Sequence, residues 1–206
     1  MNPAEHRGTR TQRGTSMLEV LVAIVIVVVG LLGLAGLQAR INLSEMESFQ
    51  RAQAIVLTQD MVDRINANRG NALSYVTTTP LGTDTGDLVC AAATTRAGRD
   101  RCEWNNALLG AAESSAGNKV GAMIGARGCV ANLSDPAKPY GQYLVAVVWQ
   151  GLSPTIAPGV TTCGSGSFGD DKTRRAIVAN VVVGCLQNVP GNANLCQPPT
   201  TPASAN

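Results

Sequence analysis

The sequence predicts an α+β fold in which a long N-terminal helix packs on a small antiparallel β-sheet cross-linked by disulfide bonds. Residues 20–37 form a run of eighteen residues without a charge, close to the length of about 20 that a helix needs to cross a bilayer. No Gly or Pro interrupts residues 39–68, so the helix is expected to continue beyond that run. Segments rich in β-branched residues follow residue 126, and all six cysteines lie beyond the apolar run, which predicts a sheet in an oxidising compartment.

The first half of the helix, residues 15–38, is predicted to span the membrane. The polar segment before it, residues 1–14, carries three arginines, and basic residues at this place hold that end of the chain in the cytoplasm: Arg7, Arg10 and Arg13. Many Val and Ile residues are compatible with a helix in lipid, where the backbone must satisfy its own hydrogen bonds. Three glycines occur at three-residue spacing in this run: Gly30, Gly33 and Gly36. We interpret them as sites of close packing against neighbouring helices, and the alternative is a weak point where the helix can unwind or bend.

The second half of the helix, residues 39–69, is predicted to be amphipathic. Its larger apolar side chains share about half of the helical circumference and need a partner, for which the sheet is the candidate: Met46, Phe49, Val56, Leu57, Met61 and Ile65. Two ion pairs with i,i+4 spacing are expected on its surface, Glu47 with Arg51 and Asp60 with Arg64. Gly70 is expected to end the helix as a C-cap.

Residues 70–196 are predicted to form an irregular connection followed by the β domain. Between residues 73 and 126 the periodicity is poor, and only a short helix near Asn106–Ser114 is expected. Residues 127–133, 142–150 and 174–186 have the composition of strands and are joined by Gly- and Pro-containing loops, so an antiparallel meander is the simplest assembly. With two Phe, three Tyr and two Trp in the chain, the core is expected to consist of Val, Leu, Ile and Ala. Residues 197–206 are predicted to be a disordered tail.

The cysteines indicate structural disulfides, because their number is even and no C-x-x-C pair suggests a metal or redox site. The meander places the start of its first strand, near Cys129, beside the end of the second strand, whose loop carries Cys163. Local pairing is therefore expected, although Cys163 and Cys185 can exchange roles in this scheme: Cys90 with Cys102, Cys129 with Cys163, and Cys185 with Cys196.

The composition argues against an enzyme and against nucleic-acid binding. His6 is the only histidine and lies in the polar leader, so the remaining chain lacks the imidazole of Ser-His-Asp and Cys-His catalysis and of many metal sites. The 16 Lys and Arg residues nearly balance the 14 Asp and Glu residues, which gives no basic field for a nucleic acid. No catalytic residue, cofactor or metal ion is predicted.

Three weaker patterns are interpreted as ordinary loops. The string "GSGSFG", residues 164–169, has G-x-G-x-x-G spacing but leads into a strand, whereas a dinucleotide fingerprint opens a helix. Asp170 and Asp171 lack the full ligand spacing of a calcium loop. Three arginines close in sequence are expected on a solvated loop: Arg96, Arg99 and Arg101.

The junction between the leader and the apolar run resembles the type IV prepilin signature. In "RGTSMLEVLVA", Gly14 ends a basic leader, Thr15 follows it, and Glu19 is the fifth residue after the junction. The string "MLEVLVAIVIVVVGLLGLAGLQ", with "AIVLTQDMVDRINANR" after it, is similar to the PilV, or pilus modification, family of minor pilins. The resemblance covers residues 13–69 strongly and the later "VAVVWQG" and "RRAIVANV" more loosely. It departs at Thr15, because the mature chain in this family commonly begins with Phe or another apolar residue.

The resemblance implies a pilin-like fold and a processing pathway. A prepilin peptidase is expected to cleave between Gly14 and Thr15 and the new N-terminus to be methylated. Glu19 is expected to pair with the terminal amine of a neighbouring subunit during assembly. The predicted Cys185–Cys196 bridge is similar to the C-terminal disulfide loop of pilins.

The implied function is that of a structural, non-enzymatic minor pilin of the type IV pilus. It is expected in the inner membrane with one helix and a periplasmic domain, and then in the extracellular pilus, where it takes part in priming of assembly or in the tip complex for motility or adhesion. Other minor pilins, the major pilin and a large tip adhesin are the implied partners. Two alternatives stay open: a type II secretion pseudopilin, which shares the same N-terminal signature, and a signal-anchored periplasmic protein of unrelated function.

Overall fold

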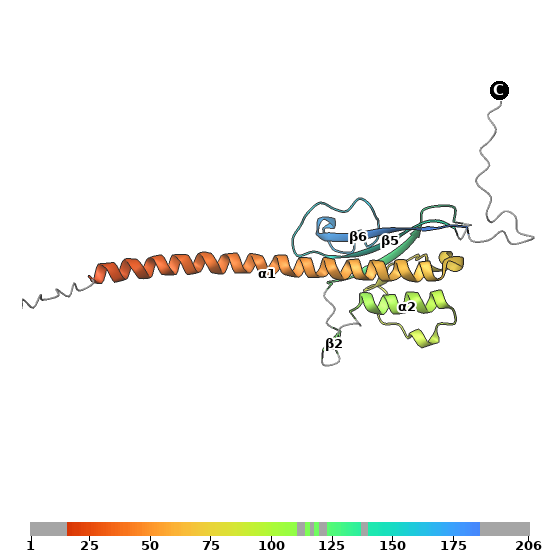
Figure 1. Cartoon of the computed structure of the whole chain (residues 1–206), viewed down its shortest axis with the longest axis horizontal. Coiled ribbons are helices and arrows are strands. Elements are labelled where there is room, and N and C mark those ends of the chain that lie inside the picture. Colours follow the sequence, from red (N-terminus) through yellow and green to blue (C-terminus); the bar gives the residue numbers. More distant parts are fainter. Residues whose placement is uncertain (1–15, 111–113, 116–117, 120–122, 137–139, 186–206) are drawn as a thin grey trace, which may run out of the picture. The chain divides into compact units, whose positions relative to one another are not determined.

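The computed structural model describes residues 16–110, 114–115, 118–119, 123–136 and 140–185. They form an α+β architecture with a long N-terminal helix and a β-sheet (Figure 1). The sheet has four antiparallel strands, and two disulfide bonds link described cysteines. The chain divides into two compact units, Met1–Glu45 and Met46–Asn206, and helix α1 (Met17–Ala67) contributes to both. The predicted leader, residues 1–14, and the predicted tail, residues 197–206, lie outside the described residues.

In the first unit, α1 is an uninterrupted apolar helix. It contains an 18-residue window with a mean hydropathy of 3.1, and within the described ranges α1 is the one helix long and apolar enough to cross a membrane. Its side chains are exposed from Ser16 to Glu45, and a Cβ built on Gly30, Gly33 or Gly36 meets no other atom within 4 Å. The predicted apolar helix is thus confirmed from Met17 onward, and it is consistent with a single-pass membrane segment or a signal anchor.

In the second unit, α1 buries a narrower stripe than the sequence predicts. The buried positions follow a strict helical spacing, and three of them were predicted: Gln50, Ala54, Leu57, Thr58, Met61 and Ile65. The prediction is wrong for Met46, Phe49 and Val56, which are 53%, 52% and 63% exposed. At 100° per residue, Met46 borders this stripe, whereas Phe49 and Val56 lie well outside it.

The end of α1 also differs from the prediction. The helix ends at Ala67, and a 3₁₀ helix, η1 (Arg69–Tyr75), follows directly and contains Gly70. Gly70 is not among the glycines with positive φ, so it is not the left-handed C-cap that was expected. Hydrogen bonds of the 3₁₀ type continue the chain instead, from Asn68 N–H to Ile65 O and from Asn71 N–H to Asn68 O.

The sheet has the strand order β1-β4-β5-β6, and all neighbours are antiparallel. Its strands are β1 (Leu81–Gly82), β4 (Arg127–Asn132), β5 (Gly141–Gln150) and β6 (Arg174–Val183). The three predicted strands and their meander are confirmed, and β1 was too short to be predicted. Two short strands, β2 (Ser114–Ser115) and β3 (Asn118–Lys119), pair with each other.

The connection between η1 and β4 is more regular than predicted. It contains a 3₁₀ turn, η2 (Cys90–Ala92), and a 13-residue helix, α2 (Arg96–Leu108). The helix predicted near Asn106–Ser114 is therefore wrong, because most of the real helix precedes that segment. Thr95 begins α2 as its N-cap and accepts a hydrogen bond from Gly98 N–H. The arginine cluster lies on this helix rather than on a loop: Arg96, Arg99 and Arg101.

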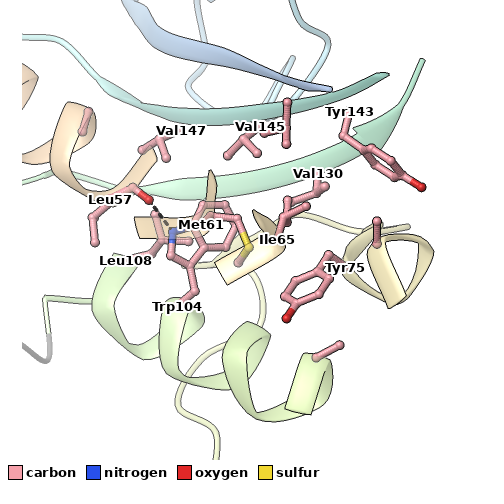
Figure 2. Packing of buried hydrophobic residues seen from close by; sticks show 14 of the residues in the cluster. Leu57, Met61, Ile65, Tyr75, Trp104, Leu108, Val130, Tyr143, Val145 and Val147 are labelled. Carbon is pink, nitrogen blue, oxygen red and sulfur yellow. Dashed lines mark hydrogen bonds between the residues drawn. The ribbon is translucent and has the colours of Figure 1, made fainter. Parts of the chain in front are cut away.

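The main core lies between α1, α2 and one face of the sheet (Figure 2). Its largest side chains are aromatic, which corrects the expectation of a purely aliphatic core: Tyr75, Trp104, Tyr143 and Trp149. The Trp104 Nε1–H donates to Leu57 O at 2.8 Å and thereby ties α2 to α1. A smaller cluster covers part of the other sheet face, where Phe168 packs with Val148 and Cys163.

Candidate assembly site

The N-terminal end of α1 carries the residue for which an assembly role was predicted. Ser16 precedes the helix, and the Glu19 N–H donates to its Oγ at 3.3 Å and to its carbonyl at 2.9 Å. Ser16 is thus the N-cap of α1, and Ser16 with Glu19 has the S-x-x-E spacing of a capping box. The sequence interpretation missed this capping role, although the spacing was visible. The predicted processing residues Gly14 and Thr15 lie outside the described residues.

Glu19 stands alone at the edge of a large apolar surface. The side chain is exposed, and its carboxylate has no interaction with the described residues. The helix dipole favours a carboxylate in this first turn. Beyond it, the large side chains from Val20 to Leu37 are between 46% and 69% exposed. Burial of each such side chain is favourable by about 1.5–3 kcal/mol, so this helix requires lipid or other helices around it.

Disulfide bonds cross-link the second unit as the cysteine pattern predicts. Cys90 is bonded to Cys102, and Cys129 is bonded to Cys163. Both pairs match the prediction, and for Cys129–Cys163 the strand order brings the β4 side chain to the loop after β5. Cys185 is disulfide-bonded as well, but its predicted partner, Cys196, lies outside the described residues, and that pairing stays a prediction.

A charged network ties α1 to α2. Arg64 bonds to Asp60 at 3.0 Å, as predicted, and also to Asp100 at 3.3 Å and Glu103 at 2.7 Å. The hydroxyl of Tyr75 donates to Asp100. Burial and this hydrogen bond raise the pKa of Tyr75 to about 12. The network therefore holds α2 against α1.

The other ion pair predicted on α1 is wrong, because Glu47 bonds to Arg175 at 3.2 Å instead of Arg51. Glu47 also accepts a hydrogen bond from Leu152 N–H at 3.2 Å. Arg175 further donates to Ser153 O at 2.6 Å. The start of the β5–β6 loop is therefore held against α1 by groups far apart in the sequence.

The two neighbouring aspartates have structural partners. Asp170 accepts a hydrogen bond from Lys172 N–H at the start of η3 (Asp171–Thr173). Asp171 bonds to Arg174 at 2.6 Å, and that hydrogen bond lowers the pKa of the carboxyl. Arg174 is 3% exposed and also donates to the loop carbonyls of Pro158, Thr161 and Cys163. These aspartates orient the loop before β6.

The "GSGSFG" string lies in turns of the same loop, where Gly164, Gly166 and Gly169 have positive φ. In the part of the chain that the structure describes, no group of three or more His, Cys, Asp or Glu residues could hold a metal ion. No family model matches the chain, and no curated protein or solved structure matches it either.

Proposed function

We propose that the chain is a structural minor pilin of the type IV pilus. One observation carries the proposal: a single carboxylate, Glu19, stands at the start of the apolar part of α1, where the side chains up to Glu45 are all exposed. The apolar run needs lipid or helical neighbours, and a carboxylate in that environment needs a positive partner. The similarity of "RGTSMLEVLVA" to the prepilin signature supports both requirements.

Cleavage between Gly14 and Thr15 supplies the positive partner. It removes a leader that contains three arginines and creates an α-amino group four residues before Glu19. A carboxylate at the apolar edge of the bilayer costs about 2–3 kcal/mol. Pairing with the amine of a neighbouring subunit offsets this cost and sets the axial offset between two helices. The same charge that is unfavourable in lipid thus selects a correctly placed neighbour.

The second unit is the periplasmic and later the extracellular part of this pilin. Its disulfides suit an oxidising compartment, and the apolar part of α1 anchors it as a single-pass protein of the inner membrane. The prepilin peptidase, companion minor pilins, the major pilin and a tip adhesin are its proposed partners. Its role is structural, in priming of pilus assembly or in the tip complex.

The N-terminal residue of the membrane-extracted chain tests the processing step. Co-expression with a prepilin peptidase should yield a chain that begins at Thr15 and has lost residues 1–14, which intact-protein mass spectrometry measures. Gly14→Val should retain Met1, whereas Gly8→Val, a matched change of the other leader glycine, should be processed normally. Processing of Gly14→Val at the normal rate would remove the basis of the proposal.

The incorporation of Glu19→Ala tests the assembly step. This variant should insert into the membrane and be processed, because the change removes a desolvation cost, but it should be scarce in sheared pili. Glu45→Ala is the matched control, because it removes an exposed carboxylate of the same helix beyond the apolar run. Normal recovery of Glu19→Ala in pili contradicts the pairing role. Recovery of the wild-type chain with a secretion complex and not with pili favours the pseudopilin.

A further inference from the structure

β6 is the terminal strand of the sheet, and one of its edges is open within the described residues. It is the last strand in the order β1-β4-β5-β6. Its pairing with β5 runs from Gly141↔Val183 to Gln150↔Arg174 without a bulge. An open edge presents a row of backbone N–H and C=O groups that another strand can pair with.

The register identifies the backbone groups that point to the open edge. The Gly151 N–H donates to Thr173 O at 2.8 Å, and this pair continues the register in which Gln150 lies opposite Arg174. Opposed residues in an antiparallel pair alternate between hydrogen-bonded and non-hydrogen-bonded. The odd-numbered residues of β6 therefore bond to β5, and the even-numbered residues direct their N–H and C=O groups outward: Ala176, Val178, Asn180 and Val182.

The β5–β6 loop covers this edge only before the strand begins. The Thr155 N–H donates to Lys172 O at 2.8 Å, which occupies the outward carbonyl at that position. Prolines and charged side chains on an edge strand block strand addition in natural sheets. Beyond Arg175, residues 176–182 contain neither. Asn180 is exposed, and Val182 is 68% exposed. The open segment is thus uncharged and accessible among the described residues.

We propose that residues 176–182 of β6 bind an extended segment of a partner protein by β-strand addition. Backbone hydrogen bonds to the four outward residues supply affinity, and the flanking side chains supply specificity. On one face the added strand lies beside Ile177 and Val181, which belong to the main core. On the other face it lies beside Ala176 and Val178, which pack on the smaller cluster. The fitting partner is therefore an uncharged segment with small or β-branched side chains on both faces.

A second copy of the chain fits this edge poorly when both copies share one membrane. Two β6 strands pair in antiparallel fashion about a two-fold axis perpendicular to the sheet. Because α1 packs on the face of the sheet (Figure 2), this axis reverses the direction of α1 between the copies. Only one of the two helices could then enter the membrane. This step rests on the membrane anchoring proposed above, whereas strand addition itself does not.

Binding of a synthetic strand to the full chain in detergent tests the inference. The probe is a fluorescent peptide whose core alternates Thr and Val and whose ends carry lysines, and the control peptide has a proline at the centre of the core. Fluorescence anisotropy should show binding of the probe alone. Asn180→Pro should weaken binding about tenfold, because it removes one outward N–H and no bond to β5. Asn180→Ala, which keeps that N–H, should bind within about twofold of wild type.

A second measurement and a second pair of variants support this test. Binding of the probe should slow amide hydrogen exchange more at the even-numbered residues from 176 to 182 than at the odd-numbered residues. If Asn180→Pro unfolds, Val182→Pro with Val182→Ala replaces the pair. Equal affinity of the proline variant and wild type overturns the proposal, and so does the absence of binding at millimolar probe.

Two other occupants are separate outcomes that also overturn it. Binding that appears only after residues 186–206 are removed, with Cys185→Ser, assigns the edge to the C-terminal segment of the same chain. A dimer in analytical ultracentrifugation that Asn180→Pro dissociates assigns the edge to a second copy. Since the assay uses purified chain, its failure leaves the processing and pilus tests untouched, and their failure leaves strand addition untouched.

Discussion

Gly128 in β4 is a position where a single methyl group should destabilise the second unit. A Cβ built on Gly128 overlaps the six-membered ring of Trp104 and lies 2.6 Å from Leu108 Cδ1. Trp104 is fully buried, and its Nε1–H donates to Leu57 O. The indole therefore cannot shift without disturbing its buried packing and that hydrogen bond. Gly128→Ala forces a displacement of the strand or of the indole.

The magnitude follows from the size of that overlap. Carbon atoms in contact normally lie about 3.5–4 Å apart, so one partner must move by about 1 Å. Overpacking of this kind costs about 1–3 kcal/mol. For a domain of this size, each kcal/mol lowers the melting temperature by about 2–4 °C. Gly128→Ala should therefore lower the thermal midpoint of the second unit by about 2–12 °C.

Near-UV circular dichroism of the full chain in detergent measures this midpoint, and a double-mutant cycle identifies the clash. Trp104→Phe destabilises by itself, but it removes the ring atoms that the new methyl group meets. The cost of Gly128→Ala should fall by about 1 kcal/mol or more in that background. Gly70→Ala is the matched control, because a Cβ there meets nothing within 4 Å. Additive costs in the cycle, or equal midpoints for Gly128→Ala and Gly70→Ala, would refute the reasoning.

Three further perturbations address the titrating groups and the disulfide. Since the pKa of Tyr75 is raised to about 12 and the unfolded chain releases this proton near pH 10, stability should fall between about pH 10 and 12, and Tyr75→Phe should flatten that part of the melting profile. The hydrogen bond from Arg127 lowers the pKa of Asp84. The ionised carboxylate therefore stabilises the fold fully above about pH 4, and this contribution is lost as the pH falls through the lowered pKa. Asp84→Asn should show a smaller loss of stability on acidification. Replacing Cys129 and Cys163, 34 residues apart, by Ser should cost about 2–4 kcal/mol in denaturant unfolding. An unchanged profile in either pH series, or an unchanged midpoint without the disulfide, contradicts the corresponding assignment.

The sequence predicted the elements whose periodicity is local and uninterrupted. The apolar run and the absence of Gly and Pro after it predicted α1, and three apolar segments separated by Gly- and Pro-containing loops predicted β4, β5 and β6. The Cys129–Cys163 disulfide followed from the meander, because the strand order alone places Cys129 near the loop with Cys163. The Cys90–Cys102 disulfide followed from the proximity of these two cysteines in the sequence. The helix and the strands depend on the composition of continuous segments, which a sequence displays directly.

Helix α2 escaped prediction because a polar residue lies in its buried stripe. Asn105 is fully buried, and its amide accepts from Gly82 N–H at 2.7 Å and donates to Gly86 O at 2.6 Å. These partners come from the preceding segment and cannot be read from local spacing. The other buried residues of α2 are apolar, but Asn105 interrupts their helical spacing: Ala97, Cys102, Trp104 and Leu108. The same limit applies to Glu47, whose partner Arg175 is 128 residues away.

The N-terminus of α1 offers two physical explanations for an effect of Glu19, and substitutions can separate them. If the negative charge recruits a neighbouring amine, Glu19→Gln should fail in assembly as Glu19→Ala does, while Ser16→Ala should assemble. If the helix start is decisive, Ser16→Ala should fail, because it removes the Oγ that accepts from Glu19 N–H, a loss of about 1 kcal/mol. The second unit is compact by itself and contains the whole buried core, so neither substitution should change its melting temperature. An assembly defect with an unchanged melting temperature would therefore originate in the helix terminus and not in a misfolded domain.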